Sequence, residues 1–323
     1  MEENFPKGAA WMGGKFIDIS EAKIPVLDWG FLRSDATYDV VHVWNNRFFR
    51  LDHHIDRFYA STKKIHMPCK IERNELKKIL AGCVKRANFE NSYVEMIQTR
   101  GMSPTFDRDP RKSIPRFIAF AIPFGWILDP KKFDVGLDLA ISKIKRISPD
   151  SVDPKVKNYH WLDLVNGMYE AYDRGHYTAV LVDEENNVLE GPGFNIFSLS
   201  KDCLITPNKG VLEGITRQTA IDLAIELDIE VKEATISSED FKNSILSNKD
   251  PVKSILLSVK DMAYNPDVKA IIVFSNSGKS AKLVSAMRPA AKIVTISPNI
   301  NVSRQVSLLW GVQSINSRDA NGW

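Results

Sequence analysis

Residues 269–297 contain a buried strand, a short polar loop, a helix and a second buried strand in succession. The strands are "KAIIVF" and "KIVTIS", and the loop that precedes the helix is "SNSGKS". Because a strand–helix–strand connection within one sheet is almost always parallel and right-handed, this stretch predicts a βαβ unit. The residues before it show alternating short strands, turns and amphipathic helices, with no such unit. The sequence therefore predicts a domain boundary near Asn243.

The chain of 323 residues is long enough for two or three domains. Residues 1–125 predict a small α+β domain, with a hairpin turning at Asn45-Asn46 and two amphipathic helices after it. Residues 126–243 predict a larger domain of strands and turns with two helices, and residues 244–323 predict a short α/β segment. The expected fold class is a two-domain α+β protein followed by a βαβ segment.

Composition excludes several classes of function. The net charge of +3 is too small to indicate nucleic-acid or anionic-membrane binding, and the longest apolar runs are only as long as a strand. No signal peptide is expected, because the N-terminus has no apolar core segment. Three widely spaced cysteines and six histidines show no metal-ligand spacing, so we expect no metal site and a reduced, cytoplasmic location.

Two lysines, Lys155 and Lys157, stand close together in "SVDPKVKNYHW", just before an amphipathic helix. Lysine is mostly a surface residue, so both could be solvated. One of them could instead be a nucleophile. Because positions two apart share a face of a strand, alternation alone does not choose between them.

Four stretches carry a resemblance to a known family. They are "TYDVVHVWNNRFFRLDHHIDRF" (37–58), "VKN" (156–158), "NVLEGPGFNIF" (187–197) and "LITPNKGVLEGITR" (204–217). In this order they resemble the fold-type IV pyridoxal-phosphate enzymes over residues 8–243, nearest the (R)-amine transaminase, branched-chain and D-amino-acid aminotransferase branch. The expected protein is thus an α+β two-domain fold-type IV aminotransferase.

The resemblance implies roles for residues around the cofactor ring. Lys157 would be the Schiff-base lysine and the acid/base that moves the substrate proton. Glu190 would face the pyridine nitrogen, although a solvent-facing glutamate beside a turn is the alternative. Leu212 would pack on the ring face, and Tyr38 would line the substrate pocket.

The resemblance also implies a phosphate site. Ile215 and Thr216 begin a helix whose N–H groups favour an anion, although Thr216 could be a simple N-cap. Arg57 matches the family's phosphate-clamping arginine. Arg108 is a candidate for binding the substrate carboxylate, with Arg111 as a competitor.

The resemblance ends early, because the family's Thr-rich, Gly-containing turn is replaced by "SILSN". The large domain is therefore expected to be truncated, with impaired phosphate binding. Residues 247–315 instead resemble part of the pyruvate kinase C-terminal domain, whose barrel and catalytic residues are missing. We expect the segment to be a fusion, an artefact of the gene model, or a replacement for the lost part of the fold. Its loop could bind a phosphorylated ligand through Ser275, Asn276, Ser277, Gly278, Lys279 and Ser280.

The expected function is transfer of an amino group between an amino acid or amine and a keto acid, with pyridoxal phosphate as cofactor. The resemblance also implies a homodimer. Two alternatives remain open: a lyase of the same family acting on an aminated chorismate, and a non-catalytic protein that binds or senses a phosphorylated metabolite.

Overall fold

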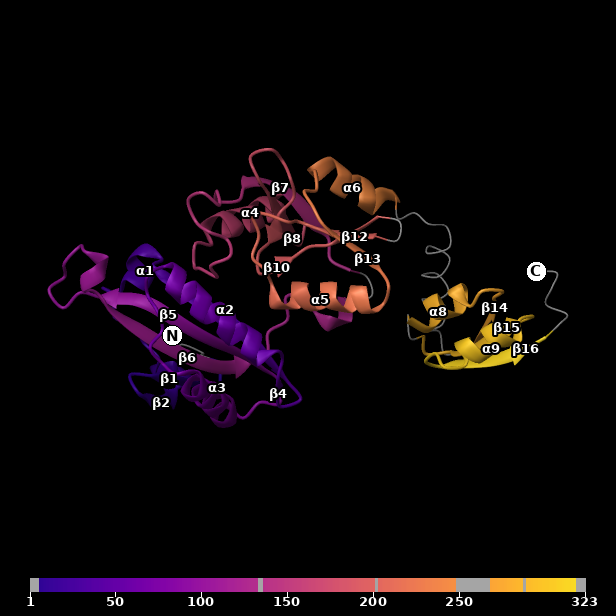
Figure 1. Cartoon of the computed structure of the whole chain (residues 1–323), viewed down its shortest axis with the longest axis horizontal. Coiled ribbons are helices and arrows are strands. Elements are labelled where there is room, and N and C mark those ends of the chain that lie inside the picture. The colour runs from indigo at the N-terminus through magenta and orange to yellow at the C-terminus, as the bar shows by residue number, and fades with distance from the viewer. Residues whose placement is uncertain (1–5, 133–135, 201–202, 248–267, 287–288, 318–323) are drawn as a thin grey trace. The chain divides into compact units, whose positions relative to one another are not determined.

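The computed structural model describes residues 6–132, 136–200, 203–247, 268–286 and 289–317. The chain separates into two compact units, Met1–Lys242 and Asn243–Trp323 (Figure 1). Each unit has its own sheets and its own hydrophobic core. The predicted subdivision of the first unit at residue 125 stays a prediction.

Strands β1 to β13 belong to the first unit, and the second unit contains a sheet of three parallel strands. The strands are β1 (Ala9–Met12), β2 (Lys15–Asp18), β3 (Ala36–Trp44), β4 (Arg47–Phe48), β5 (Ser92–Met102), β6 (Ile114–Pro123), β7 (Leu139–Lys145), β8 (Thr178–Val182), β9 (Glu190–Gly191), β10 (Phe194–Asn195), β11 (Ser198–Ser200), β12 (Cys203–Thr206), β13 (Glu230–Glu233), β14 (Ala270–Phe274), β15 (Lys292–Ser297) and β16 (Val312–Asn316).

Helices alternate with strands along the chain in both units. The helices are α1 (Trp29–Arg33), α2 (Leu51–Lys64), α3 (Arg73–Ala87), α4 (Leu162–Asp173), α5 (Ile215–Glu226), α6 (Ser238–Ser247), α8 (Lys279–Ala286) and α9 (Ile300–Val306), with short 3₁₀ turns η1 (Ile19–Glu21), η2 (Pro110–Lys112) and η3 (Pro130–Lys132).

The N-terminal half of the first unit is a six-stranded antiparallel sheet, ordered β2-β1-β6-β5-β3-β4. The predicted hairpin is confirmed, since β3 and β4 pair across Asn45 and Asn46, both with positive φ. Helices α2 and α3 pack their apolar residues on one face of this sheet. The predicted stripe of α3 is confirmed, because its core members Leu76, Ile79, Leu80 and Cys83 are fully or almost fully buried.

Strand β3 presents different residues on its two faces, because side chains alternate along a strand. Val41 lies in the core beneath the helices, and Asp39, two residues earlier, contacts α2. Tyr38 points to the opposite face, where its ring stacks on Tyr159. This face carries the candidate site.

The C-terminal half of the first unit corrects one expectation. Strands β7 and β8 pair in parallel with α4 between them, and β12 and β13 pair in parallel with α5 between them. The expectation that no βαβ unit precedes Asn243 was therefore wrong. Long-range pairing brings these strands together, since residues 146–161 separate β7 from α4 and hide the pattern in the sequence.

The second unit contains the predicted βαβ unit. Strands β14, β15 and β16 form a parallel sheet in that order, with α8 and α9 as the crossovers. The helices bury Ala281, Val284, Val302 and Val306 against Ile293 of β15. The chain is thus a mixed α+β unit followed by a short α/β segment, and the predicted fold class is confirmed.

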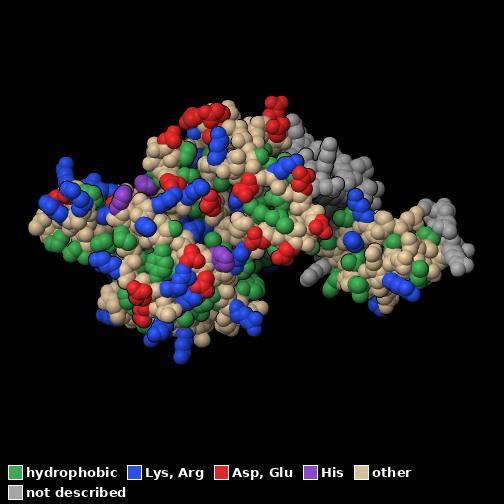
Figure 2. Space-filling view, in the orientation of Figure 1, with side chains coloured by type: hydrophobic (Ala, Val, Ile, Leu, Met, Phe, Trp, Pro, Cys, Tyr) green, Lys and Arg blue, Asp and Glu red, His purple; other side chains and the backbone are tan. Residues whose placement is uncertain are grey.

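Basic and acidic side chains are interspersed over the face of the first unit seen in Figure 2. Among the described helices, none is long and apolar enough to cross a membrane.

Candidate active site

The backbone of Lys157 is attached to the edge of β3. Its carbonyl accepts hydrogen bonds from the Tyr38 N–H at 3.0 Å and from the Thr37 hydroxyl at 2.7 Å. Its own N–H donates to the Ser61 hydroxyl of α2 at 3.4 Å. The side chain is half-buried, and its Nζ lies 4.5 Å from the centre of the Tyr38 ring. The structure therefore brings together Lys157 and Tyr38, as expected.

Burial and the nearby charges shift the acid–base equilibrium of the Lys157 amine toward its neutral form. Burial, reinforced by the positive charge of Arg57, lowers the pKa of Lys157 below its ordinary value. The negative charges of Asp39, Glu95 and Glu190 oppose that shift without cancelling it. A lysine with a lowered pKa is deprotonated more often at neutral pH, which is the form that attacks a carbonyl group.

Lys155 has a different environment. Its side chain is exposed, and its Nζ pairs with Glu213 Oε1 at 2.6 Å. That hydrogen bond raises the pKa of Lys155. Residues 146–161 form turns and bends rather than a strand, so strand alternation does not relate the two lysines. Burial therefore distinguishes Lys157 as the candidate nucleophile.

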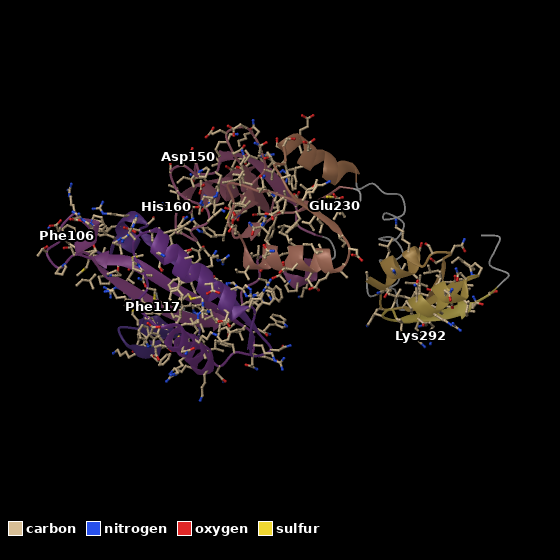
Figure 3. The ribbon with its side chains drawn as sticks, in the orientation of Figure 1. Phe106, Phe117, Asp150, His160, Glu230 and Lys292 are labelled. Carbon is tan, nitrogen blue, oxygen red and sulfur yellow. The ribbon has the colours of Figure 1, made fainter. Side chains whose placement is uncertain are left out.

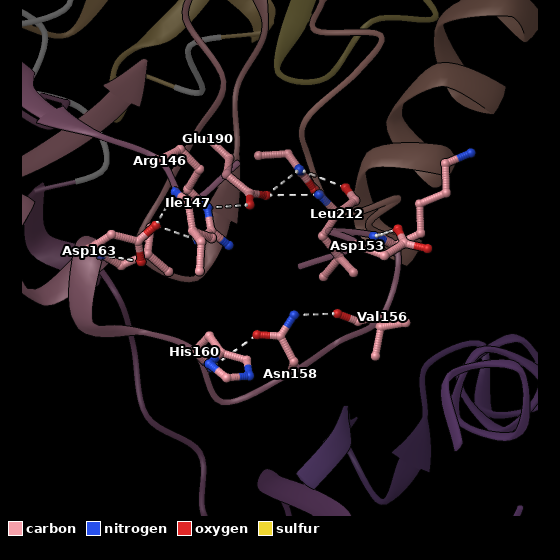
Figure 4. A network of polar contacts seen from close by, with 12 residues as sticks. Arg146, Ile147, Asp153, Val156, Asn158, His160, Asp163, Glu190 and Leu212 are labelled. Atoms are coloured by element: carbon pink, nitrogen blue, oxygen red, sulfur yellow. Dashed lines mark hydrogen bonds and ion pairs between the residues drawn. The ribbon is translucent and has the colours of Figure 1, made fainter. Parts of the chain in front are cut away.

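Glu190 is a buried carboxylate with partners on several elements (Figure 4). Its Oε2 accepts the Leu212 N–H at 3.0 Å and faces Asn195 Nδ2 at 3.5 Å, while Arg146 Nε lies 3.3 Å from Oε1. Burial raises the pKa of Glu190, although Arg146 and the Leu212 N–H oppose the shift. Arg146 also forms an ion pair with Asp163 at 2.6 Å. The position of the Glu190 carboxylate is therefore fixed by a partner that is itself held.

Arg57 lies beside the N-terminus of α5. Its NH1 donates to the Glu213 carbonyl at 3.1 Å, two residues before the helix begins at Ile215. Gly214 is the N-cap, so no side chain caps the first-turn N–H groups of this helix, and Thr216 is exposed beside them. An arginine next to an uncapped helix N-terminus suits an anion. The phosphate-binding roles of Arg57, Ile215 and Thr216 stay predictions.

A cluster that sequence reasoning missed surrounds Glu95 of β5. Glu95 is buried, and both carboxylate oxygens accept hydrogen bonds from phenols, Tyr159 on Oε1 and Tyr93 on Oε2 at 3.0 Å. The Tyr159 ring stacks on that of Tyr38, with 4.3 Å between centroids. Burial raises the pKa of Glu95, and the two phenols and Lys157 limit the shift. Tyr93 and Glu95 are two positions apart in a predicted strand and therefore share a face. This pattern is a signal that could have indicated them.

Other residues that the sequence did not indicate contact the candidate residues Arg57 and Glu190 and belong to no motif. Their signals are weak because each partner lies far away in the sequence. They are Asp39, which pairs with Arg57, and Arg146, which contacts Glu190 and pairs with Asp163.

The loop that carries Arg108 joins β5 to β6. Figure 3 labels Phe106 on this loop, and its ring is exposed. Arg108 is exposed too and makes no hydrogen bond or ion pair with the described residues, whereas Arg111 pairs with Asp109 at 2.7 Å. A carboxylate-binding role for Arg108 stays a prediction.

The polar loop of the second unit lies between β14 and α8. The Ser275 hydroxyl accepts the N–H of Gly278 at 2.9 Å, and the Ser277 hydroxyl accepts that of Lys279 at 3.4 Å. Gly278 has a positive φ of 79°, which a glycine adopts without strain. The binding of a phosphorylated ligand by residues 275–280 stays a prediction. In the part of the chain that the structure describes, no group of three or more potential ligands could hold a metal ion.

An activated lysine, a buried carboxylate and an arginine at a helix N-terminus suit an enzyme of the pyridoxal-phosphate transaminase class. Comparison with known proteins gives the family. The amino-transferase class IV family matches residues 36–248, and the pyruvate kinase alpha/beta domain matches residues 253–322. The chain belongs to the class IV aminotransferases, and both predicted resemblances are confirmed.

Several of the similar proteins are named as branched-chain aminotransferases. A putative branched-chain-amino-acid aminotransferase of Methanocaldococcus jannaschii is 31% identical over 233 residues, covering 71% of this chain and 79% of that protein. The enzyme of Salmonella typhimurium is 25% identical over 261 residues, covering 76% and 84%.

Solved structures support the fold-type IV assignment. The branched-chain aminotransferase of Thermoproteus uzoniensis with norvaline has a TM-score of 0.66 and 28% identity, covering 72% of this chain and 80% of that one. The T.th. enzyme with pyridoxamine 5'-phosphate has a TM-score of 0.67 and 25% identity, covering 72% and 78%.

Proposed function

We propose that this chain is a pyridoxal-phosphate-dependent transaminase that moves an amino group between an amino acid or amine and a keto acid. The observation that carries the proposal is the placement of Lys157, whose Nζ lies 4.5 Å from the centre of the Tyr38 ring and within the field of Glu190 and Arg57. Burial there also lowers the pKa of Lys157. The residues of this site fit the cofactor. A nucleophilic amine, a buried carboxylate and a cationic group that can bind an anion are all present in one half-buried place.

Each residue has a distinct task in this proposal. When bound, pyridoxal phosphate supplies an electron sink for the carbon that bears the amino group. Lys157 Nζ holds the cofactor and then carries the proton to and from that carbon. Glu190 would keep the pyridine nitrogen protonated, Leu212 would pack on the ring, and Tyr38 would line the substrate side.

The phosphate is the weaker part of the site. Arg57 and the first turn of α5, at Ile215 and Thr216, would hold it. Helix α6 runs through Ser247, where the family is expected to have a strand and a second phosphate-binding turn. Each charged hydrogen bond left unmade would cost about 1–3 kcal/mol, so we expect weaker cofactor binding than in a complete family member.

Spectral titration with pyridoxal phosphate tests the proposal. We expect saturable binding that is lost in Lys157→Ala, and amino transfer from branched-chain amino acids, which the names of the relatives suggest, or from amines. Binding without transfer but with cleavage of an aminated chorismate would favour the lyase. Absence of binding, with no effect of Lys157→Ala, would refute the enzyme and favour the non-catalytic phospholigand-binding protein.

Two further experiments address the rest of the proposal. Titration of a version with the family's usual C-terminal ending, beside this chain, measures the effect of the missing turn. Light scattering of the purified protein tests the proposed homodimer. The substrate role of Arg108, the ligand of the 275–280 loop and a cytoplasmic location stay predictions.

A further inference from the structure

A buried carboxylate, Asp39 of β3, lies between two cationic or potentially cationic side chains of α2. Its side chain is fully buried. Arg57 donates to it twice, from Nε to Oδ2 at 2.7 Å and from NH2 to Oδ1 at 2.9 Å. His54 Nδ1 lies 2.8 Å from the same Oδ1. A buried charge needs such partners, so the three side chains form one unit.

The hydrogen bonds of Arg57 leave a defined part of its guanidinium available. Of the five N–H donors of an arginine, two point at Asp39 and one at the Glu213 carbonyl. One N–H on NH1 and one on NH2 have no acceptor among the described residues. These two donors, the free N–H fork of Arg57, belong to one planar group and can donate to the oxygens of a phosphate.

Among the described residues, the only hydrogen-bond partner of the His54 side chain is Asp39. Its ring is buried, and its Nε2 makes no hydrogen bond within the described part of the chain. Its polar contact is therefore the one that holds Asp39 Oδ1. Burial opposes ionisation of Asp39, but the hydrogen bonds from His54 and Arg57 outweigh it and lower the pKa of the carboxyl group.

We propose that Asp39 and His54 are positioning residues that aim the free N–H fork of Arg57 at the phosphate of the cofactor. The inference rests on the proposed function, since it concerns the same cofactor. Asp39 fixes the guanidinium along one edge, and His54 fixes Asp39. Without them Arg57 keeps its charge but loses the orientation that two simultaneous phosphate bonds require.

The test compares two cofactor forms that differ only in the phosphate. Dissociation constants for pyridoxal phosphate and for pyridoxal are measured by absorbance on wild type and Asp39→Asn. The new amide keeps the shape but turns a donor toward Arg57. We expect pyridoxal phosphate to bind about tenfold or more weakly, with the pyridoxal constant changed less than about twofold. Asp52→Asn is the control, since this exposed carboxylate of α2 pairs with Arg73 and Lys77 instead.

A second pair of variants keeps the test decisive if Asp39→Asn fails to fold. His54→Asn retains a donor near the position of Nδ1, and His54→Leu removes it. We expect Asn to preserve and Leu to lose the preference for pyridoxal phosphate, with the exposed neighbour variant His53→Asn unchanged. Equal losses for both cofactor forms, or no loss, would overturn the inference. Failure of wild type to bind either form would refute the proposed function instead.

Discussion

The Nζ of Lys157 lies 4.5 Å from the centre of the Tyr38 ring, and the Tyr38 N–H donates to the Lys157 carbonyl at 3.0 Å. A single residue of β3 therefore contacts both ends of the lysine. The backbone bond sets where the lysine begins, and the ring limits where its amine can lie. This arrangement fixes the position of a lysine that lies in an irregular segment, as the proposed attack on a carbonyl group would require.

The first prediction concerns the pair of lysines. Lys157→Ala should abolish covalent cofactor attachment and lower amino transfer by at least about a hundredfold, because it removes the nucleophile and the proton carrier together. Lys155→Ala should retain nearly full activity, since it loses only an exposed ion pair with Glu213. Borohydride trapping of the cofactor and an amino-transfer assay measure both. Equal losses in the two variants would contradict the assignment of Lys157.

The second prediction concerns pH. Burial and Arg57 lower the pKa of Lys157, so the neutral amine forms at a lower pH than in a free lysine, whose pKa is about 10.4. The rate of attachment of pyridoxal should therefore rise through a midpoint below that value. Between the folded and the unfolded pKa, the unfolded chain binds more protons at Lys157. The contribution of this residue to the free energy of unfolding should thus increase with pH in that window.

Stopped-flow absorbance over a pH series measures the attachment rate. Comparison of urea unfolding between wild type and Lys157→Met isolates the contribution of the lysine to stability. A midpoint at or above that of free lysine would show that the amine is not activated in the folded protein.

The third prediction concerns Glu190. Glu190→Gln keeps an acceptor for the Leu212 N–H but removes the charge that is proposed to hold the pyridine proton. We expect kcat to fall about a hundredfold or more while the cofactor stays bound. Steady-state kinetics and the visible spectrum report the two effects separately. Glu185→Gln, at an exposed position nearby, should leave both unchanged.

The fourth prediction concerns Glu95. Burial raises its pKa, so above the unfolded pKa the folded state holds a proton that the unfolded state has lost. The contribution of Glu95 to stability is therefore present at low pH and is lost as pH rises through the folded pKa. Glu95→Gln does not titrate, so its free energy of unfolding should increase relative to wild type as the pH rises.

Denaturant unfolding of the cofactor-free protein at several pH values measures this difference. The exposed variant Glu90→Gln should show no comparable trend. A difference between Glu95→Gln and wild type that does not change with pH would mean that the two phenols and Lys157 fully offset the burial of the carboxylate.

The fifth prediction concerns Gly214, the N-cap of α5. A Cβ at this position would lie 2.2 Å from Asn195 Oδ1, which is too close for an ordinary contact. Gly214→Ala should therefore displace Asn195 and its bond to the Leu212 carbonyl, with a loss of stability of about 1–3 kcal/mol. Gly125→Ala is the control, because nothing lies within 4 Å of its Cβ. Thermal unfolding and cofactor titration of both variants measure the effect.

Local patterns were sufficient for most helices and strands. The stripe of α3 and the turn at Asn45-Asn46 follow from short-range periodicity and turn chemistry, which act within a few residues. The two βαβ units before Asn243 were missed. Parallel pairing joins strands across long connections, and the sequence of each strand does not state its partner.

The sequence by itself determined the family, the elements and the motif positions Lys157, Glu190 and Arg57, because these follow from local order along the chain. Only the tertiary structure decided which lysine is half-buried and which side chains surround these three candidate residues. Those partners, among them Asp39 and Glu95, lie on other elements. Strand alternation sets the face of a side chain, but the packing of distant segments decides what covers that face.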